Sequence, residues 1–334
     1  MSRRFMALTV ASLLGLLSIL WAGSSHAAYA SSLPTQFYAP YQDVTIGPTL
    51  KSVVQSTGQK YFTLAFITSE GGCKAAWGGS VPLNKTSTDL PHLASDISYI
   101  RSKGGDVLVS FGGQAGTELA LACSSVSSLQ KQYQSVIDAY KVTHLDFDIE
   151  GGTEGDSTSY TRRNTALAAL QKANPGLSIS FTLPSETTGL LSDSIGLLNN
   201  AKSKGVTFSI VNLMTMDYAG PDSHMGQESI NAANGFYKQL QKIYPSKTSS
   251  QLWSMIGLTN LIGQNDTAKE IFTLSDAQKV LAFAQQQHLG ELSMWEVSRD
   301  NGSCPGATSD EDTCSGLSQS TYAFTNIFKA FSTN

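Results

Sequence analysis

Three acidic residues alternate with apolar residues in one short segment of the chain. Asp146, Asp148 and Glu150 are separated by Phe147 and Ile149. Because residues two apart in a β-strand share a face at a spacing of about 6.6 Å, the three carboxyls are predicted to point one way and the apolar side chains the other. Carboxyls this close cannot all ionise, so the pKa of at least one is expected to rise. Such a group can hold a proton at neutral pH and donate it, which is general acid chemistry.

Placement on one strand restricts what these acids can do. A retaining glycosidase with a protein nucleophile holds two carboxyls on opposite sides of the sugar, about 5 Å apart. Acids on one strand lie on the same side of a bound sugar, so one can protonate the leaving oxygen but none can attack from behind. In the substrate-assisted exception, the 2-acetamido oxygen of the sugar attacks C1 and closes an oxazolinium ring. Glu150 would then be the acid and later the base, and Asp148 would orient the acetamido N–H.

The segments that must position these acids alternate between strand and helix patterns. Amphipathic stretches such as Leu129, Tyr133, Val136 and Tyr140 have helical spacing and separate the β-rich runs. Eight strands are predicted, over residues 36–41, 61–68, 106–111, 144–150, 177–183, 208–216, 253–258 and 291–295. This alternation favours a single-domain α/β fold, a (β/α)8 TIM barrel with its active site at the carboxyl ends of the strands. An open doubly wound sheet is the alternative, but no glycine-rich phosphate loop follows the first strand.

The segment Leu145–Glu150, which reads L-D-F-D-I-E, resembles the fourth-strand signature D-x-x-D-x-D-x-E of the glycoside hydrolases of family 18. Thr143 stands where that family has its first acid, which is a departure from the pattern. Three further elements occur in the order expected for strands three, six and eight. They are Ser110–Gly113 (S-F-G-G), Met214–Tyr218 (M-T-M-D-Y) and Trp295–Asp300 (W-E-V-S-R-D). This ordered set covers most of the chain and is most similar to the bacterial and archaeal chitinase branch of the family.

The resemblance implies that Asp146, Asp148, Glu150, Asp217 and Tyr218 form the catalytic set. Asp217 would hydrogen-bond the acetamido oxygen or Glu150, and could stay protonated because other acids lie near it. Tyr218 would donate a phenolic hydrogen bond to the acetamido group. The alternative for Tyr218 is an ordinary core tyrosine, since tyrosines are often half-buried.

The resemblance also implies a substrate-binding set. Trp295 would form the floor on which the apolar face of the sugar stacks, with core packing as the alternative. Gly112 and Gly113 would let the backbone come close to the site, unless they only form a tight turn. Met214 would line the site or simply fill the barrel. Tyr41, on the first strand, would contact the sugar, on the family analogy alone.

Composition narrows the class of partner. Only 14% of the residues are charged, against about 25% in typical proteins. The net charge is −4 and no basic cluster occurs, which does not suit a nucleic acid and favours an uncharged glycan. No cofactor or metal is expected, because the five histidines are scattered and no Cys-x-x-Cys is present. The protein is expected to be a monomer.

The first residues predict a secretory signal peptide. Arg3 and Arg4 precede an apolar run over residues 5–21, and small residues follow, so cleavage is expected after Ala27 or Ala30. A membrane anchor is the alternative, but the run is slightly short for a full span. The mature catalytic barrel is then expected over residues 31–334 of a secreted, extracellular protein that does not associate with a membrane.

The chain has four cysteines, and an even number in an exported chain indicates two disulfides. Four cysteines allow three pairings. The closeness of Cys304 and Cys314 in the sequence favours a disulfide between them, which leaves Cys73 to pair with Cys123.

Together, these observations predict a retaining chitinase that hydrolyses β-1,4-linked N-acetylglucosamine polymers. An endo-β-N-acetylglucosaminidase acting on N-glycans or peptidoglycan would use the same acids, so the motifs do not exclude it. A chitin-binding lectin or inhibitor on the same fold is a further alternative. Such non-enzymatic relatives lose the catalytic glutamate, whereas Glu150 is present here.

Overall fold

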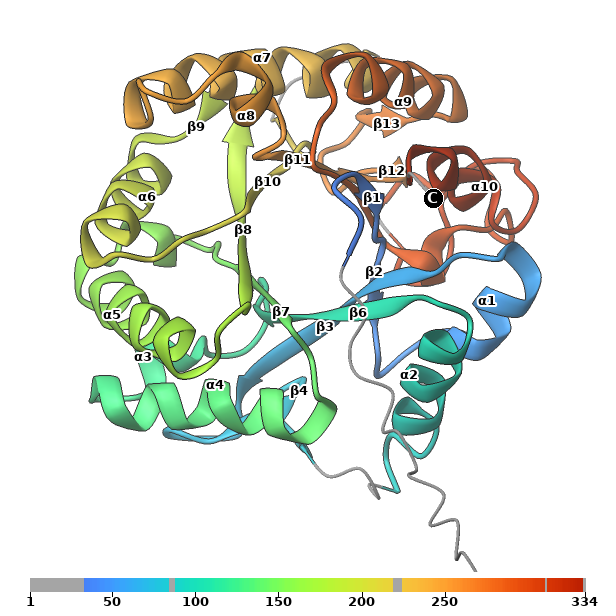
Figure 1. Cartoon of the computed structure of the whole chain (residues 1–334). Helices are drawn as coiled ribbons and strands as arrows, with labels where there is room; N and C mark the ends of the chain where they lie inside the picture. The colour runs from blue at the N-terminus through green and yellow to red at the C-terminus, as the bar shows by residue number, and fades with distance from the viewer. Residues whose placement is uncertain (1–32, 84–87, 219–223, 310, 333–334) are drawn as a thin grey trace, which may run out of the picture.

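The strands form a closed barrel with helices around it (Figure 1). The computed structural model describes residues 33–83, 88–218, 224–309 and 311–332. Within these ranges the parallel strands follow the order β1-β14-β11-β10-β8-β7-β6-β3, and β2 pairs with β3. The barrel strands are β1 (Phe37–Tyr38), β2 (Tyr41–Asp43), β3 (Tyr61–Ser69), β6 (Asp106–Gly112), β7 (His144–Asp148), β8 (Ser178–Glu186), β10 (Ile210–Met214), β11 (Ile256–Leu261) and β14 (Glu291–Trp295). The predicted (β/α)8 barrel is therefore confirmed, and the open-sheet alternative is wrong.

The first barrel strand is divided into β1 and β2, although the sequence predicted one strand over residues 36–41. Pro40 lies between the two parts and has no N–H to donate to a neighbouring strand. β1 pairs with β14, and β2 pairs with β3. The divided strand thus still joins the last strand to the second and closes the ring.

The predicted strand over residues 253–258 begins too early. Residues Ser249–Trp253 form the short helix α8, which starts at a capping box between Thr248 and Gln251. The strand β11 begins only at Ile256. The apolar residues Leu252 and Trp253 gave the helix end the appearance of a strand, because short apolar runs do not separate the two states.

The helices and short strands complete the structure around the barrel. The helices are α1 (Leu50–Thr57), α2 (Leu93–Ser102), α3 (Leu119–Ala122), α4 (Val126–Tyr140), α5 (Ser157–Ala173), α6 (Ser192–Lys204), α7 (Met225–Ile243), α8 (Ser249–Trp253), α9 (Leu274–Gln287) and α10 (Ala323–Phe328). Single 3₁₀ turns are η1 (Thr153–Gly155), η2 (Val297–Arg299) and η3 (Lys329–Phe331). The short strands are β4 (Ala75–Trp77), β5 (Val81–Pro82), β9 (Gly189–Leu190), β12 (Gly263–Gln264) and β13 (Ile271–Phe272).

The apolar core lies mainly between the strands and the surrounding helices. Phe147 on β7 faces outward, where its ring stacks on Phe111 and meets Tyr133 of α4 edge to face. A smaller apolar cluster, which includes Phe37, Leu108 and Ile210, lies near the amino ends of the strands. The barrel interior further along the strands contains polar side chains, so the outward face carries most of the hydrophobic stabilisation.

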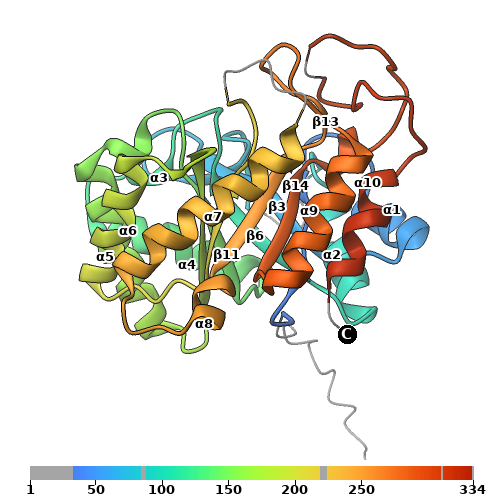
Figure 2. The ribbon, with the colours of Figure 1, turned by 90° about the horizontal axis from the view of Figure 1, so that it is seen from above.

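Both predicted disulfides are confirmed. Cys73 bonds to Cys123, which ties the segment after β3 to the residue that follows α3. Cys304 bonds to Cys314 within the segment that follows β14. Figure 2 shows that the segments after β11 and β14 extend beyond the helices at one end of the barrel.

The predicted signal peptide, residues 1–27, lies outside the described residues. Within the described ranges, no helix combines the length and the apolar character that crossing a membrane requires.

Candidate active site

The three acids of the fourth barrel strand form a column that ends at the carboxyl end of the barrel. Asp146 and Asp148 lie on β7 and are 2% and 5% exposed, whereas Glu150 is half-buried two residues beyond Asp148. The predicted register is correct, since Phe147 packs outward. The strand ends at Asp148 and not at Glu150, so Glu150 stands on the loop that enters α5.

Asp146 is held by hydroxyl groups from three other strands of the barrel, β2, β6 and β8. Tyr41 and Ser110 donate to its Oδ2 over 2.8 Å and 2.7 Å. Ser180 and Thr182 donate to its Oδ1 over 2.6 Å and 3.0 Å. Burial raises the pKa of Asp146, and these hydrogen bonds oppose the rise because they favour the charged form. These hydrogen bonds fix the orientation of Asp146, which lies at the buried end of the column.

Tyr41 has a different role from the predicted sugar contact. Its side chain is 1% exposed, and its hydroxyl also contacts Thr182 over 2.8 Å. A side chain so fully covered offers almost no surface to a ligand. The structure therefore assigns Tyr41 to positioning Asp146, and a direct contact with substrate is not supported.

Asp148 and Glu150 are close enough to influence each other's protonation. Burial raises the pKa of Asp148 well above its usual value, and the charges of Glu150 and Asp146 raise it further. Burial also raises the pKa of Glu150, while a hydrogen bond with Asp148 opposes that rise. Asp148 Oδ1 has no hydrogen-bond partner among the described residues. The pair can therefore hold one proton between them, with one buried acceptor left for an N–H group.

The raised pKa of Glu150 predicts an alkaline limb in the dependence of kcat/KM on pH. If Glu150 is the general acid, as predicted, it must be protonated to act, so activity is expected below its raised pKa and should be lost as the pH rises through it. Asp148→Ala removes the hydrogen bond that lowers the pKa of Glu150, so its alkaline limb is expected at higher pH than in the wild type. Profiles of kcat/KM against pH for both proteins test this. An alkaline limb that does not move would contradict a shared proton.

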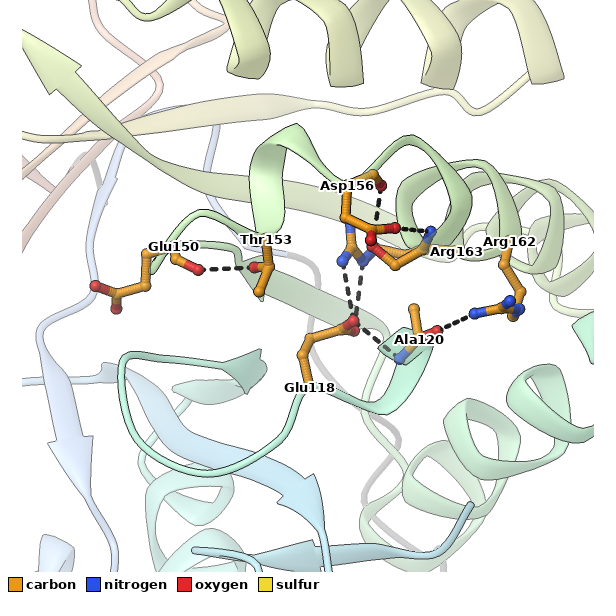
Figure 3. Close-up of polar contacts among 8 residues, drawn as sticks. Glu118, Ala120, Glu150, Thr153, Asp156, Arg162 and Arg163 are labelled. Atoms are coloured by element: carbon orange, nitrogen blue, oxygen red, sulfur yellow. Dashed lines mark hydrogen bonds and ion pairs between the residues drawn. The ribbon is translucent and has the colours of Figure 1, made fainter. Parts of the chain in front are cut away.

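The loop that carries Glu150 is fixed at both ends (Figure 3). Thr153 donates its hydroxyl to the Glu150 carbonyl over 2.7 Å, and Asp156 caps α5 by accepting from the Ser159 amide over 2.6 Å. Further along α5, Arg163 forms a 2.9 Å ion pair with Glu118, and both side chains are almost fully buried. This ion pair ties the loop after β6 to the helix that follows Glu150.

Arg163→Met is expected to lower the free energy of unfolding by about 3–5 kcal/mol, because it leaves the buried Glu118 carboxylate without its partner. Chemical denaturation followed by fluorescence measures the loss. The control is Lys74→Met, which breaks a salt bridge to Glu70 whose side chains are 62% and 28% exposed, and should cost at most about 1 kcal/mol. Equal free energies of unfolding for the two variants would show that the buried pair contributes no more to stability than the exposed pair.

Asp217 and Tyr218 follow the sixth barrel strand, as predicted. The Asp217 backbone is left-handed, with φ 49°, and its Oδ1 accepts from the Thr267 amide over 2.8 Å. The Tyr218 amide donates to Glu270 Oε2 over 3.0 Å. The Tyr218 hydroxyl lies near Ser185 but makes no hydrogen bond of normal geometry among the described residues. Tyr218 thus keeps a buried hydroxyl whose proton can be offered to a ligand.

Met214 is the last residue of β10 and is buried. It is two residues beyond Asn212, which donates to Thr182 and Thr259 inside the barrel. Because residues two apart share a face, Met214 also faces the interior. This placement is consistent with both predictions for Met214, lining of the site and filling of the barrel interior.

Trp295 ends β14 and stacks on Phe66 with ring centroids 5.3 Å apart and planes 13° apart. Tyr41 contacts the same indole at 5.7 Å. Trp295 is only partly buried, so some of its ring surface remains available to a ligand. Phe66, which supports the indole, was not among the predicted residues.

Gly112 and Gly113 bring the end of β6 against the backbone of Asp148. A Cβ atom on Gly112 would lie 2.0 Å from the Asp148 carbonyl oxygen, and one on Gly113 would lie 2.7 Å from the Phe66 ring. The Gly113 amide donates to the Asp148 carbonyl over 3.0 Å. A close backbone approach is therefore required here, in addition to the positive φ that a tight turn alone would explain.

Several residues at the site were not predicted. Ser180 and Thr182 alternate with apolar residues on the predicted strand over residues 177–183, a pattern that could have placed them beside Asp146. No comparable alternation of polar and apolar residues marks Asn265 and Glu270 in the sequence. They approach Asp217 and Tyr218 from a distant part of the chain.

Residues 36–252 match the model of the glycosyl hydrolases family 18. The chain belongs to this family. It is 36% identical to the catalytic domain of a hyperthermophilic chitinase from Pyrococcus furiosus, with a TM-score of 0.82 over 90% of this chain and 96% of that one. It is 34% identical to a probable bifunctional chitinase/lysozyme of Escherichia coli over 89% of this chain, and 34% identical to endochitinase 11 of Metarhizium anisopliae over 80%. These matches span 35% and 53% of the length of those two curated relatives.

Proposed function

We propose that this protein is a chitinase that hydrolyses β-1,4-linked N-acetylglucosamine polymers by a substrate-assisted, retaining mechanism. The observation that carries the proposal is the acid column that begins on β7. Glu150 stands at its open end, and Asp148 keeps one buried oxygen without a hydrogen-bond partner among the described residues. An acetamido group has an N–H that suits such an acceptor. The names of the relatives, which include two chitinases and an endochitinase, support the same substrate class.

In the proposed first step, Glu150 donates its proton to the glycosidic oxygen while the acetamido oxygen attacks C1. The bond from C1 to the leaving oxygen breaks, and an oxazolinium ring forms. Asp148 accepts a hydrogen bond from the acetamido N–H and stabilises the positive charge that develops on the ring. In the second step, Glu150 removes a proton from water, which attacks C1 and opens the ring.

We further propose that the protein is exported and acts outside the cell. The proposal rests on the charged start, the apolar run and the small residues that end at Ala27 or Ala30. A chain with two disulfides suits an oxidising compartment. Mass spectrometry of the protein recovered from culture medium tests export, since the expected N-terminus begins after one of these two alanines.

An assay on three substrates separates chitinase activity from its alternatives. The protein should hydrolyse soluble chitin oligomers and should not cleave cello-oligosaccharides, which lack the 2-acetamido group. Preferential release of the glycan from a high-mannose glycopeptide would instead establish an endo-β-N-acetylglucosaminidase. Binding of chitin oligomers without any hydrolysis would favour the lectin.

A further inference from the structure

The hairpin of β12 (Gly263–Gln264) and β13 (Ile271–Phe272) reaches the end of the sixth barrel strand from a different part of the chain. The segment between its strands provides three contacts to Asp217 and Tyr218. The Thr267 amide donates to Asp217 Oδ1 over 2.8 Å, and Glu270 Oε2 accepts from the Tyr218 amide over 3.0 Å. Asn265 Oδ1 accepts more weakly from the Asp217 amide, over 3.4 Å.

These contacts hold a backbone that would otherwise be unfavourable. A non-glycine residue in the left-handed region, as Asp217 is at φ 49°, persists where its surroundings restrain it. Asn265 and Glu270 are both fully buried, so their polar groups are committed to the protein and do not exchange with water. The hairpin thus sets the direction in which the Asp217 side chain leaves the backbone after β10.

The hairpin is in turn held by Arg299. This buried guanidinium donates to the carbonyls of Ile262 and Gln264 over 3.1 Å and 2.7 Å. Arg299 follows Trp295 by four residues, and the Ile262 amide donates to the Trp295 carbonyl over 3.2 Å. The segment that runs from Trp295, the predicted sugar platform, to Arg299 is therefore joined to the hairpin that holds Asp217.

We infer that Glu270 and Arg299 are positioning residues for Asp217, acting through the β12–β13 hairpin. The Thr267 amide holds one Asp217 oxygen and so fixes the orientation of the carboxyl that would meet the acetamido group. The inference rests on the proposed function for the identity of that group. A carboxyl that turns or shifts after loss of the hairpin contacts would bind the transition state less well than the ground state, so kcat should suffer more than KM.

The test compares Glu270→Ala with Glu270→Gln on a soluble chitin oligomer. We expect Glu270→Ala to lower kcat by about 10-fold to 100-fold with KM changed less than about threefold. Glu270→Gln keeps a carbonyl oxygen for the Tyr218 amide and should retain most of the kcat. If Glu270→Ala does not fold, Thr267→Pro removes the amide donor to Asp217 at a half-exposed position and should give the same pattern of loss.

Asp300 provides a matched control beside Arg299. It is equally buried, but its carboxylate accepts from the amides of Phe324 and Thr325 at the start of α10. Among the residues that the structure describes, the Asp300 side chain has no hydrogen bond to the hairpin. We expect Asp300→Asn to lower the Tm while keeping the wild-type kcat at 25 °C. Arg299→Lys, which cannot reproduce the planar fork of donors, should lower kcat.

A second readout does not depend on the substrate. Amide hydrogen exchange at Tyr218 should become faster in Glu270→Ala and stay slow in Glu270→Gln, because only the former loses the acceptor. Wild-type exchange and wild-type kcat in Glu270→Ala would overturn the inference. A wild-type protein without activity on chitin oligomers, but with the expected exchange pattern, would overturn the proposed function and leave the hairpin contacts established.

Discussion

Glu150→Gln is expected to fold normally and to lose at least about 10²-fold to 10⁴-fold in kcat, which is the range that general acid catalysis alone contributes. Glutamine keeps the size and shape of the side chain but has no proton to transfer to the leaving oxygen. The Thr153 hydroxyl and amide both bind the Glu150 carbonyl and not its side chain, so the loop should keep its conformation. Steady-state kinetics on a soluble chitin oligomer measure the effect, and circular dichroism checks the fold.

Glu154→Gln is the matched control for this variant. Glu154 is a buried acid on the same loop, and its charge contributes to the raised pKa of Glu150. We expect the control to keep kcat within about threefold at its optimum and to move the alkaline limb to lower pH, because a nearby negative charge is removed. A Glu150→Gln protein that turns over at nearly the wild-type rate would remove Glu150 from the mechanism.

Asp148→Asn is expected to lower kcat by about 10²-fold or more, whereas Thr143→Ala should change it by less than about threefold. Asparagine keeps the size of Asp148 but cannot carry the negative charge that stabilises the developing oxazolinium ring. Thr143, which stands where the family has its first acid, lies just before β7 at the amino end of the strand. Its hydroxyl contacts His144 Nδ1 over 3.0 Å, and its carbonyl accepts from the Ser178 amide over 2.9 Å.

These contacts place Thr143 at the start of β7. It lies an odd number of residues from Asp146 and Asp148, so in an extended strand its side chain points to the opposite face from the acids. Measured kcat values and melting temperatures for both variants decide the comparison. If Thr143→Ala folded and lost as much kcat as Asp148→Asn, position 143 would have a catalytic duty and the role given to the column would need revision.

The existence and order of the barrel strands, the register of β7 and the disulfide Cys304–Cys314 were predictable because each depends on local pattern. Strict alternation from Leu145 to Glu150 decides which side chains face inward, since a shift by one residue would turn every acid outward. The disulfide Cys304–Cys314 spans a sequence separation of only 10, and with four cysteines that pair determines the other one. Local sequence information was sufficient for these features.

The parts that could not be predicted depend on contacts between residues far apart in the sequence. Tyr41 reaches Asp146 across 105 positions, so its positioning role appears only when the barrel closes. The hairpin residue Glu270 meets Tyr218 across 52 positions, and no periodic pattern marks it. The end of β7 at Asp148 was also unpredicted, because the loop conformation depends on Gly151 and Gly152 adopting positive φ.

The anomeric form of the first product tests the central claim most directly. Proton NMR, recorded within the first minutes of hydrolysis of a chitin oligomer, distinguishes the two anomers before they interconvert. Two successive displacements at C1, one by the acetamido oxygen and one by water, restore the original configuration. The account therefore predicts that the β-anomer forms first, followed by slow equilibration with the α-anomer. An initial α-anomer would mean a single displacement by water and would contradict the substrate-assisted mechanism.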